Sequence, residues 1–169
     1  VAELGRAAAD GLLAAGVLPV VKHMPGHGRA AADSHSDLPV VTAPLAELDA
    51  TDFAPFRALN DLPMGMTAHI RFAALDDAPA TASARIIALI CDRIGFDGLL
   101  MSDDITMNAL AGSESDRAAA SIAAGCDLVL HCNRDVAQME PVVAAAGPMT
   151  PLARRRADGL SNRSAAREL

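Results

Sequence analysis

The segment KHMPGHGRAAADSHSDLP, residues 22–39, holds three histidines, one lysine and two aspartates among glycines and alanines. An imidazole titrates near neutral pH, so it can give a proton to a reacting atom and later take one back. Asp33 precedes His35 by two residues, and a tight turn can bring its carboxylate onto one ring nitrogen, which fixes the tautomer and favours the imidazolium. The pattern indicates a general acid–base pair, although an isolated Asp-Ser-His triplet more often belongs to a solvated loop.

A second candidate for chemistry is the pair Asp103-Asp104, which directly follows the apolar run GLLMS at residues 98–102. A carboxylate at the junction of a strand and its loop is held rigidly enough to be aimed at a substrate atom. Aspartates at such junctions also serve as helix N-caps, and on the residues alone capping is the more common role. Both interpretations stay open at this point.

The histidines of the first segment also raise the alternative of a zinc site. His23, His27 and His35 are spaced by four and eight residues, but they lie in a Gly/Ala-rich loop and no cysteine pair accompanies them. The three cysteines of the chain lack metal-type spacing and indicate reduced thiols in a cytoplasmic protein. We therefore expect neither a metal nor a cofactor.

Four short apolar runs predict the elements that position these side chains. They do not alternate polar with apolar residues, which is typical of parallel strands covered on both faces. Helical patterns separate them, so the order of elements predicts an α/β fold with right-handed crossovers. The predicted strands are VLPVV (17–21), MGMTAH (64–69), GLLMS (98–102) and CDLVLHC (126–132).

The helical patterns carry recognisable start and stop signals. Ser113 opens one of them, and Asp116 three residues later can share the capping role. Gly16 and Gly95 follow two others as C-terminal caps, while Pro55 marks a break or a new start. The predicted helical segments span residues 2–16, 45–60, 81–95, 113–125 and 135–147.

Polar residues stand at the carboxyl end of every predicted strand: Lys22-His23, His69, Asp103-Asp104, and residues 131–133. Functional groups gathered at the mouths of parallel strands are the organisation of a (β/α)8 barrel of the TIM type. Only about four strand–helix units are present where closure needs eight. The sequence therefore predicts a partial (β/α)8 barrel, with residues 1–169 as one domain that forms half of it.

Composition excludes several classes of partner. A net charge of −7 argues against binding to nucleic acid. No apolar run approaches the roughly 20 residues of a membrane span, and no secretory leader is visible. We expect a cytoplasmic protein without a membrane partner, and we expect the basic stretch Arg154–Arg156 to form a solvated helix face.

Several motifs, taken in order, resemble the second half of a known catalytic barrel. KHMPGHG with ADSH, then MTAHI, GFDGLLMSDDITM and AGCDLVLHCN are similar to the C-terminal half of the family 3 glycoside hydrolase barrel. The nearest subgroup is the bacterial β-N-acetylglucosaminidases of peptidoglycan recycling, and the resemblance covers nearly the whole chain. Arg29-Ala30 stands where many members have Asp-Thr, and the first half of the barrel has no counterpart here.

The resemblance implies retaining hydrolysis of terminal β-linked N-acetylglucosamine from muropeptides or related glycosides. It selects Asp103 as the nucleophile that forms a covalent glycosyl–enzyme intermediate, and leaves Asp104 as a neighbour that orients the loop or caps a helix. It also implies that His35, on a loop and backed by Asp33, serves as the acid–base residue in place of a second carboxylic acid.

The resemblance further assigns the residues that bind the sugar. Lys22 and His23 are expected to bind hydroxyl groups of the N-acetylglucosamine ring, since both side chains offer hydrogen-bond donors. His69 is either a third residue lining the sugar site, which we favour, or a polar plug in the barrel mouth. His27 is expected to be structural, and no role is assigned to His131 and Asn133.

Two alternatives to the hydrolase remain at this stage. A phosphorylase is compatible with a histidine acid–base residue, because imidazole carries no negative charge that would repel incoming phosphate. The second alternative is an inactive fragment whose partner would be the missing half of the barrel. It is suggested by a chain that opens inside an apparent helix without an initiator methionine. In either case we expect little activity from these 169 residues alone.

Overall fold

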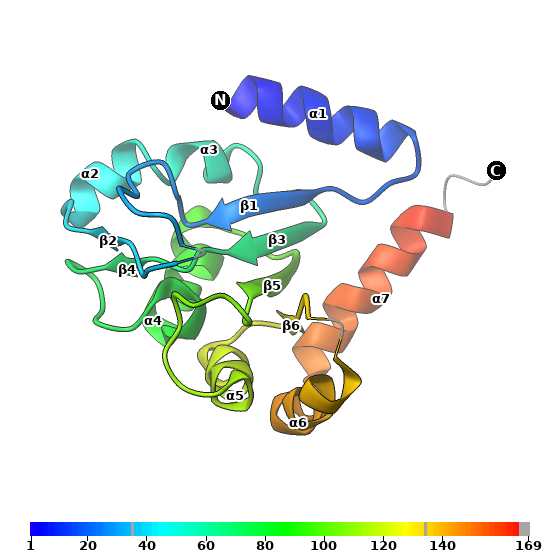
Figure 1. Ribbon diagram of the computed structural model, residues 1–169. Helices are drawn as coiled ribbons and strands as arrows, with labels where there is room; N and C mark the ends of the chain where they lie inside the picture. Colours follow the sequence, from blue (N-terminus) through cyan, green and yellow to red (C-terminus); the bar gives the residue numbers. More distant parts are fainter. Residues whose placement is uncertain (35, 134, 166–169) are drawn as a thin grey trace.

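The structure, a computed structural model, describes residues 1–34, 36–133 and 135–165. Its centre is a parallel four-stranded sheet in which the strands follow one another in chain order (Figure 1). All carboxyl ends therefore meet at one edge, which is the geometry of half a (β/α)8 barrel and confirms the predicted fold class. The strands are β1 (Val20–Met24), β3 (Met64–Thr67), β5 (Leu99–Asp104) and β6 (Leu128–Leu130).

The first strand lies further along the chain than the predicted residues 17–21. Pro19 has no N–H to donate to a ladder, so β1 begins directly after it at Val20. Lys22 and His23 therefore lie within β1 rather than beyond its end. The last strand is shorter than predicted, because only residues 128–130 of the run 126–132 are extended against β5.

The described helices occupy the segments that the sequence predicted, with the addition of α7 after them. The capping box of Ser113 and Asp116 is confirmed, and Gly95 ends its helix with a φ of +80°, a value that favours glycine. The predicted segment 45–60 is divided into two helices, and Pro55 lies in the first turn of the second. The helices are α1 (Ala2–Ala14), α2 (Leu45–Ala50), α3 (Ala54–Arg57), α4 (Ala84–Leu89), α5 (Glu114–Ala124), α6 (Val136–Ala146) and α7 (Pro151–Ala165), with single turns η1 (Ala80–Ala82) and η2 (Ile90–Ile94).

A second, two-stranded ladder was not predicted. β2 (Val40–Val41) pairs in parallel with β4 (Arg71–Phe72). Strands of two residues are too short to produce a periodic signal, which explains why the pattern missed them. The ladder matters for the site because it fixes the far end of the loop that follows β1.

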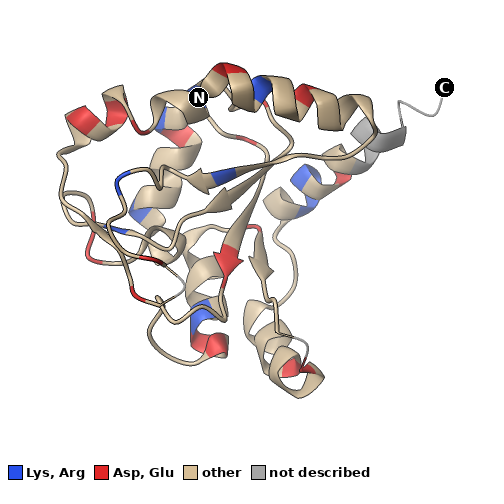
Figure 2. Ribbon diagram, turned by 45° about the horizontal axis from the view of Figure 1, so that its top comes forward, with Lys and Arg blue, Asp and Glu red and all other residues tan. Residues whose placement is uncertain are grey.

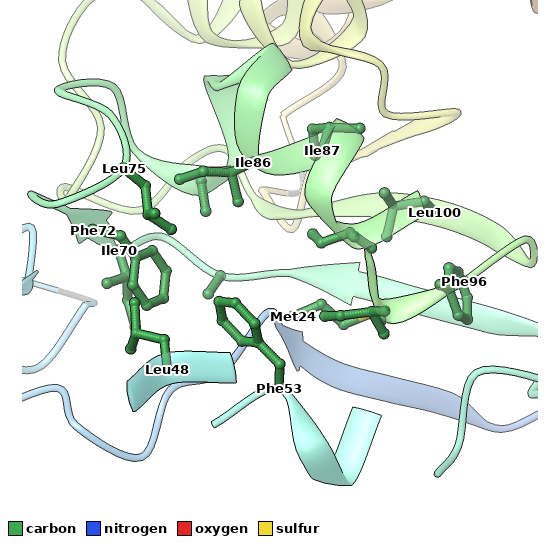
Figure 3. Close-up of a cluster of buried hydrophobic side chains, with 14 of the residues drawn as sticks. Met24, Leu48, Phe53, Ile70, Phe72, Leu75, Ile86, Ile87, Phe96 and Leu100 are labelled. Atoms are coloured by element: carbon green, nitrogen blue, oxygen red, sulfur yellow. The ribbon is translucent and has the colours of Figure 1, made fainter. Parts of the chain in front are cut away.

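The main core fills the space between the sheet and helices α2 to α4 (Figure 3). Phe53 and Leu48 from the helical side belong to the same buried cluster as Met24 and Leu100 of the strands, and all four are almost completely buried. Gly65 on β3 is a packing requirement, since a methyl group there would lie only 2.8 Å from the sulfur of Met24. The core thus fixes the strands, and with them the residues at their carboxyl ends.

The outer edge of β1 is open within the described residues, where β3 is its one strand neighbour. A hollow of about 690 Å³ lies beside it and is lined by residues of α1, β1 and α3. Leu4 and Leu12 of α1 and Val20 of β1 expose much of their apolar surface. Among the helices described, none combines the length and apolar character needed to cross a membrane.

Arg156 corrects the expectation that the basic stretch of α7 is solvated. Its side chain is 8% exposed, and its guanidinium donates to Asp127 Oδ2 at 2.9 Å and to Asp97 Oδ1 at 3.0 Å. Asp127 Oδ2 also accepts the backbone N–H of Leu100. Buried charges need such partners, so α7 is attached by an ion pair at the amino end of the sheet.

Replacing Arg156 with alanine should lower the free energy of unfolding of the chain by about 3 kcal/mol, because it leaves the carboxylate of Asp127, 3% exposed, without its counter-ion. Urea unfolding followed by circular dichroism measures the loss. Arg154→Ala, on the exposed side of the same helix, is the matched control and should change the value by less than about 0.5 kcal/mol. Equal effects of the two substitutions would contradict the buried ion pair.

Candidate active site

Two of the predicted site residues meet at the carboxyl edge of the sheet. Asp103 is the residue before the last of β5, where Figure 2 shows acidic residues at the tip of the strand, and His23 lies two strands away on β1. His23 Nε2 is 3.6 Å from Asp103 Oδ2, and their side chains are 27% and 12% exposed. This distance exceeds a hydrogen bond, so neither group is committed to the other and both can face a ligand.

The carboxylate of Asp103 is oriented by its neighbour in the chain. The backbone N–H of Asp104 donates to Asp103 Oδ1 at 2.8 Å. The side chain of Asp104 is itself fixed, because it accepts hydrogen bonds from the N–H and hydroxyl of Thr106 and from the N–H of Cys132. Burial raises the pKa of Asp104, but these hydrogen bonds outweigh it and hold the pKa below its ordinary value. The geometry gives Asp104 the loop-orienting role that the sequence offered it.

His69 lies beneath this pair and is completely buried. Its Nε2 is 2.9 Å from the carbonyl oxygen of Asp104, and its Nδ1 is 2.8 Å from Thr81 Oγ1. Burial lowers the pKa of His69, although the hydrogen bond to the Asp104 carbonyl opposes the shift. Both ring nitrogens thus have protein partners, an arrangement that fits the polar plug better than the favoured contact with sugar, which stays a prediction.

Lys22 and His23 lie side by side on β1, the lysine exposed and the histidine half-buried. Burial lowers the pKa of His23, and the carboxylate of Asp103 opposes this shift. The ring of His27 lies next, with its centroid 5.5 Å from that of His23, and His27 Nε2 is 3.4 Å from Ser34 Oγ. His27 therefore joins the two halves of the loop, in keeping with a structural role. The Lys22–His23 and Met24–Pro25 peptide bonds are cis.

The loop that follows β1 is attached to the end of α2 by Arg29. Its guanidinium pairs with Asp52 at 2.7 Å and Glu47 at 2.8 Å, and donates to Thr51 Oγ1 at 3.0 Å. Gly26 of the same loop packs on Asp52, where an added Cβ would lie 3.1 Å from that residue's Cβ. Arg29, which departs from the common motif, is therefore accommodated by its own set of partners.

The proposed acid–base pair is placed only in part. The carbonyl oxygen of Asp33 accepts the N–H groups of Ser36 and Asp37, which defines a tight turn. His35 lies outside the described residues. The pairing of Asp33 with His35 therefore stays a prediction.

Two further strand-end residues find partners that the sequence did not signal. His131 Nε2 is 2.9 Å from Glu114 at the start of α5, and Asn133 donates to Gln138. Over residues 1–34, 36–133 and 135–165, no group of three or more His, Cys, Asp or Glu side chains is arranged to hold a metal ion.

The sequence and the fold of the chain are similar to those of known proteins. Residues 1–155 match the family described as the glycosyl hydrolase family 3 N-terminal domain. A beta-hexosaminidase of Bordetella parapertussis is 45% identical over 139 residues, which cover 79% of this chain and 39% of the relative. The solved structure of a glycoside hydrolase family 3 beta-N-acetylglucosaminidase from Paenibacillus has a TM-score of 0.88 at 32% identity, over 97% of this chain and 34% of that one.

A second solved structure includes a sugar derivative. NagZ from Neisseria gonorrhoeae in complex with N-trifluoroacetyl-D-glucosamine has a TM-score of 0.81 at 32% identity, over 97% of this chain and 53% of that one. The chain spans less than half the length of the curated Bordetella relative.

The buried, neutral His69 makes stability depend on pH with a definite sign. In the unfolded chain the ring takes up a proton below its ordinary pKa near 6.5, whereas the native ring, with its lowered pKa, does not. Stability should therefore fall as pH drops below about 6.5, by at most about 1.4 kcal/mol per pH unit for this group. His69→Gln should show a shallower loss in urea unfolding measured between pH 7.5 and 5; an identical slope would contradict the assignment.

Proposed function

The chain belongs to glycosyl hydrolase family 3, and from this membership we propose that residues 1–169 form one half of a catalytic (β/α)8 barrel that hydrolyses terminal β-linked N-acetylglucosamine. The observation that carries the proposal is the approach of His23 to Asp103 at the carboxyl edge of the sheet. Catalytic groups of (β/α)8 barrels gather at this edge, because it is where the strand ends and their loops converge.

Asp103 is assigned as the nucleophile. Its Oδ1 is occupied by the N–H of Asp104, so Oδ2, on the side of His23, is the oxygen presented to a substrate. In the first step Asp103 attacks the anomeric carbon while the bond from that carbon to the leaving oxygen breaks, which yields a glycosyl–aspartate ester. The rigid end of β5 supports this role because it keeps the carboxylate aimed.

His35 is assigned as the acid–base residue, with Asp33 as the carboxylate that holds its ring. As imidazolium, His35 gives its proton to the leaving oxygen in the first step. In the second step it takes a proton from a water molecule, whose oxygen displaces Asp103 from the anomeric carbon and restores the original configuration. The assignment rests on the ADSH motif and on the turn at Asp33.

Lys22 and His23 are assigned to the sugar hydroxyls. Lys22 is exposed on β1. The half-buried His23 follows it in the chain and lies 3.6 Å from Asp103. Donors on one side of the nucleophile would orient the ring for attack. The similarity to NagZ from Neisseria gonorrhoeae, which was solved with a glucosamine derivative, supports an N-acetylglucosamine-type sugar.

A finer assignment concerns the substrate and its compartment. We propose that the glycosides are muropeptide fragments released during peptidoglycan recycling in the cytoplasm. This part rests on the resemblance of the motifs alone.

The proposal also requires a second half of the barrel. The open edge of β1 and the apolar hollow beside it are a surface on which further parallel strands and helices would pack. The curated Bordetella relative, more than twice as long as the matched segment, supports this requirement. Activity is therefore best tested both on the chain alone and on a chimera that joins it to the first half of that relative's barrel.

Asp103→Ala in the chimera should reduce hydrolysis of 4-nitrophenyl N-acetyl-β-glucosaminide more than about 1,000-fold, as expected when a covalent catalyst is removed. Asp158→Ala, an exposed aspartate on α7, is the matched control and should leave turnover intact. Turnover by Asp103→Ala close to that of the parent would refute the assignment. Formation of a sugar phosphate in phosphate buffer would show that the reaction is phosphorolysis and not hydrolysis.

His35→Ala should be sensitive to the leaving group. Alkyl glycosides, whose leaving oxygen needs a proton, should slow by about 100-fold or more, and activated aryl glycosides much less. The comparison of kcat/KM, which reports the first step, for the two substrate classes measures this, with Asp37→Ala on the same loop as the control. Equal losses for both classes would remove His35 from the role of proton donor.

A further inference from the structure

Three buried side chains lie in a row beneath the nucleophile. Thr67 Oγ1 is 2.8 Å from Thr81 Oγ1, Thr81 Oγ1 is 2.8 Å from His69 Nδ1, and His69 Nε2 is 2.9 Å from the carbonyl oxygen of Asp104. All three side chains belong to residues with no exposed surface. The row connects the interior of the domain to the backbone beside Asp103.

The direction of these hydrogen bonds follows from the partners. A carbonyl oxygen only accepts, so Nε2 of His69 must carry the proton that it shares with Asp104. Burial keeps the ring neutral by lowering the pKa of His69, which leaves a lone pair on Nδ1. The hydroxyl of Thr81 is the donor within reach of that lone pair. Thr81 Oγ1 also lies 3.1 Å from the carbonyl oxygen of Ala68, but its contact with His69 Nδ1 is the shorter one, at 2.8 Å, and Nδ1 needs a donor, so we assign the hydroxyl proton to His69.

The row ends at the backbone of Asp104, which orients the carboxylate of Asp103. His69 fixes the carbonyl of Asp104, Thr106 and Cys132 fix its side chain, and its N–H donates to Asp103 Oδ1. A movement of the Asp104 backbone would therefore turn the hydrogen bond that aims Asp103. The buried ring is the contact that reaches this backbone from the core side.

We propose that Thr81 is a positioning residue of the active site: its hydroxyl holds His69 in the neutral form protonated on Nε2, so that the ring fixes Asp104 and, through it, the carboxylate of Asp103. The proposal rests on the proposed function of Asp103 and extends it to a residue of η1, which belongs to no strand. Thr81 touches no reacting atom and acts only through His69.

The matched pair Thr81→Val and Thr67→Val separates positioning from packing. Both residues are completely buried threonines that lose the same hydroxyl, but only Thr81 contacts His69. In the catalytic chimera, Thr81→Val should lower kcat about 10-fold or more with KM changed less than about 3-fold, because substrate binding does not depend on the exact aim of Asp103. Thr81→Ser keeps the donor and should restore kcat to within about 3-fold of the parent. Thr67→Val should also keep kcat within about 3-fold of the parent.

Nitrogen-15 NMR of the 169-residue chain, labelled at histidine, tests the arrangement without any enzyme activity. His69 should appear as a neutral ring protonated on Nε2 at pH 7.5 and should titrate with a midpoint below the ordinary value near 6.5. The Nδ1 resonance should move toward that of an unbonded lone pair in Thr81→Val and stay in place in Thr67→Val.

Three results would overturn the proposal: a His69 ring protonated on Nδ1, titration of that ring with a midpoint near 6.5 in the parent chain, or equal losses of kcat in the two valine variants. The first two come from the unmodified chain, so they hold even where a variant fails to fold. Failure of the proposed function would show separately, as retained turnover in Asp103→Ala.

Discussion

In a parallel sheet every strand directs its carboxyl end to the same edge, and the candidate site depends on this constraint. It brings β1 and β5 together so that His23 and Asp103 approach to 3.6 Å, although they are 80 residues apart in the chain. The constraint acts only because the strands are immobilised by a close-packed core, in which even a methyl group on Gly65 has no room. The packing of the large side chains in Figure 3 therefore determines where the strand ends lie, and with them the residues of the site.

The buried polar contacts at the two ends of the sheet have different roles. At the amino end, Arg156 and Asp127 neutralise each other and attach a helix, which is a contribution to stability. At the carboxyl end, the neutral ring of His69 fixes the carbonyl of Asp104, and the N–H of Asp104 orients one oxygen of the Asp103 carboxylate. This division is typical of barrels, whose amino ends hold the fold and whose carboxyl ends carry the chemistry.

Sequence patterns predicted the elements better than the contacts between them. Uninterrupted apolar runs identified the four parallel strands, and the Ser113 box identified a helix start, because both signals are local. The burial of Arg156 and the role of Thr81 were not predictable, since each depends on a partner from a distant segment. The resemblance to a family pointed to Asp103, but spacing alone would have left it a helix cap.

The central claim is that the carboxylate of Asp103 becomes covalently bound to the sugar. Its most direct test is to incubate the chimera with an activated 5-fluoro derivative of N-acetylglucosaminyl fluoride, which slows both steps, and to map the modified peptide by mass spectrometry. We expect one glycosyl group per active site on the peptide that contains Asp103, and fragmentation that assigns it to this residue. A glycosyl group on another residue, or turnover of the reagent without any covalent adduct, would contradict it.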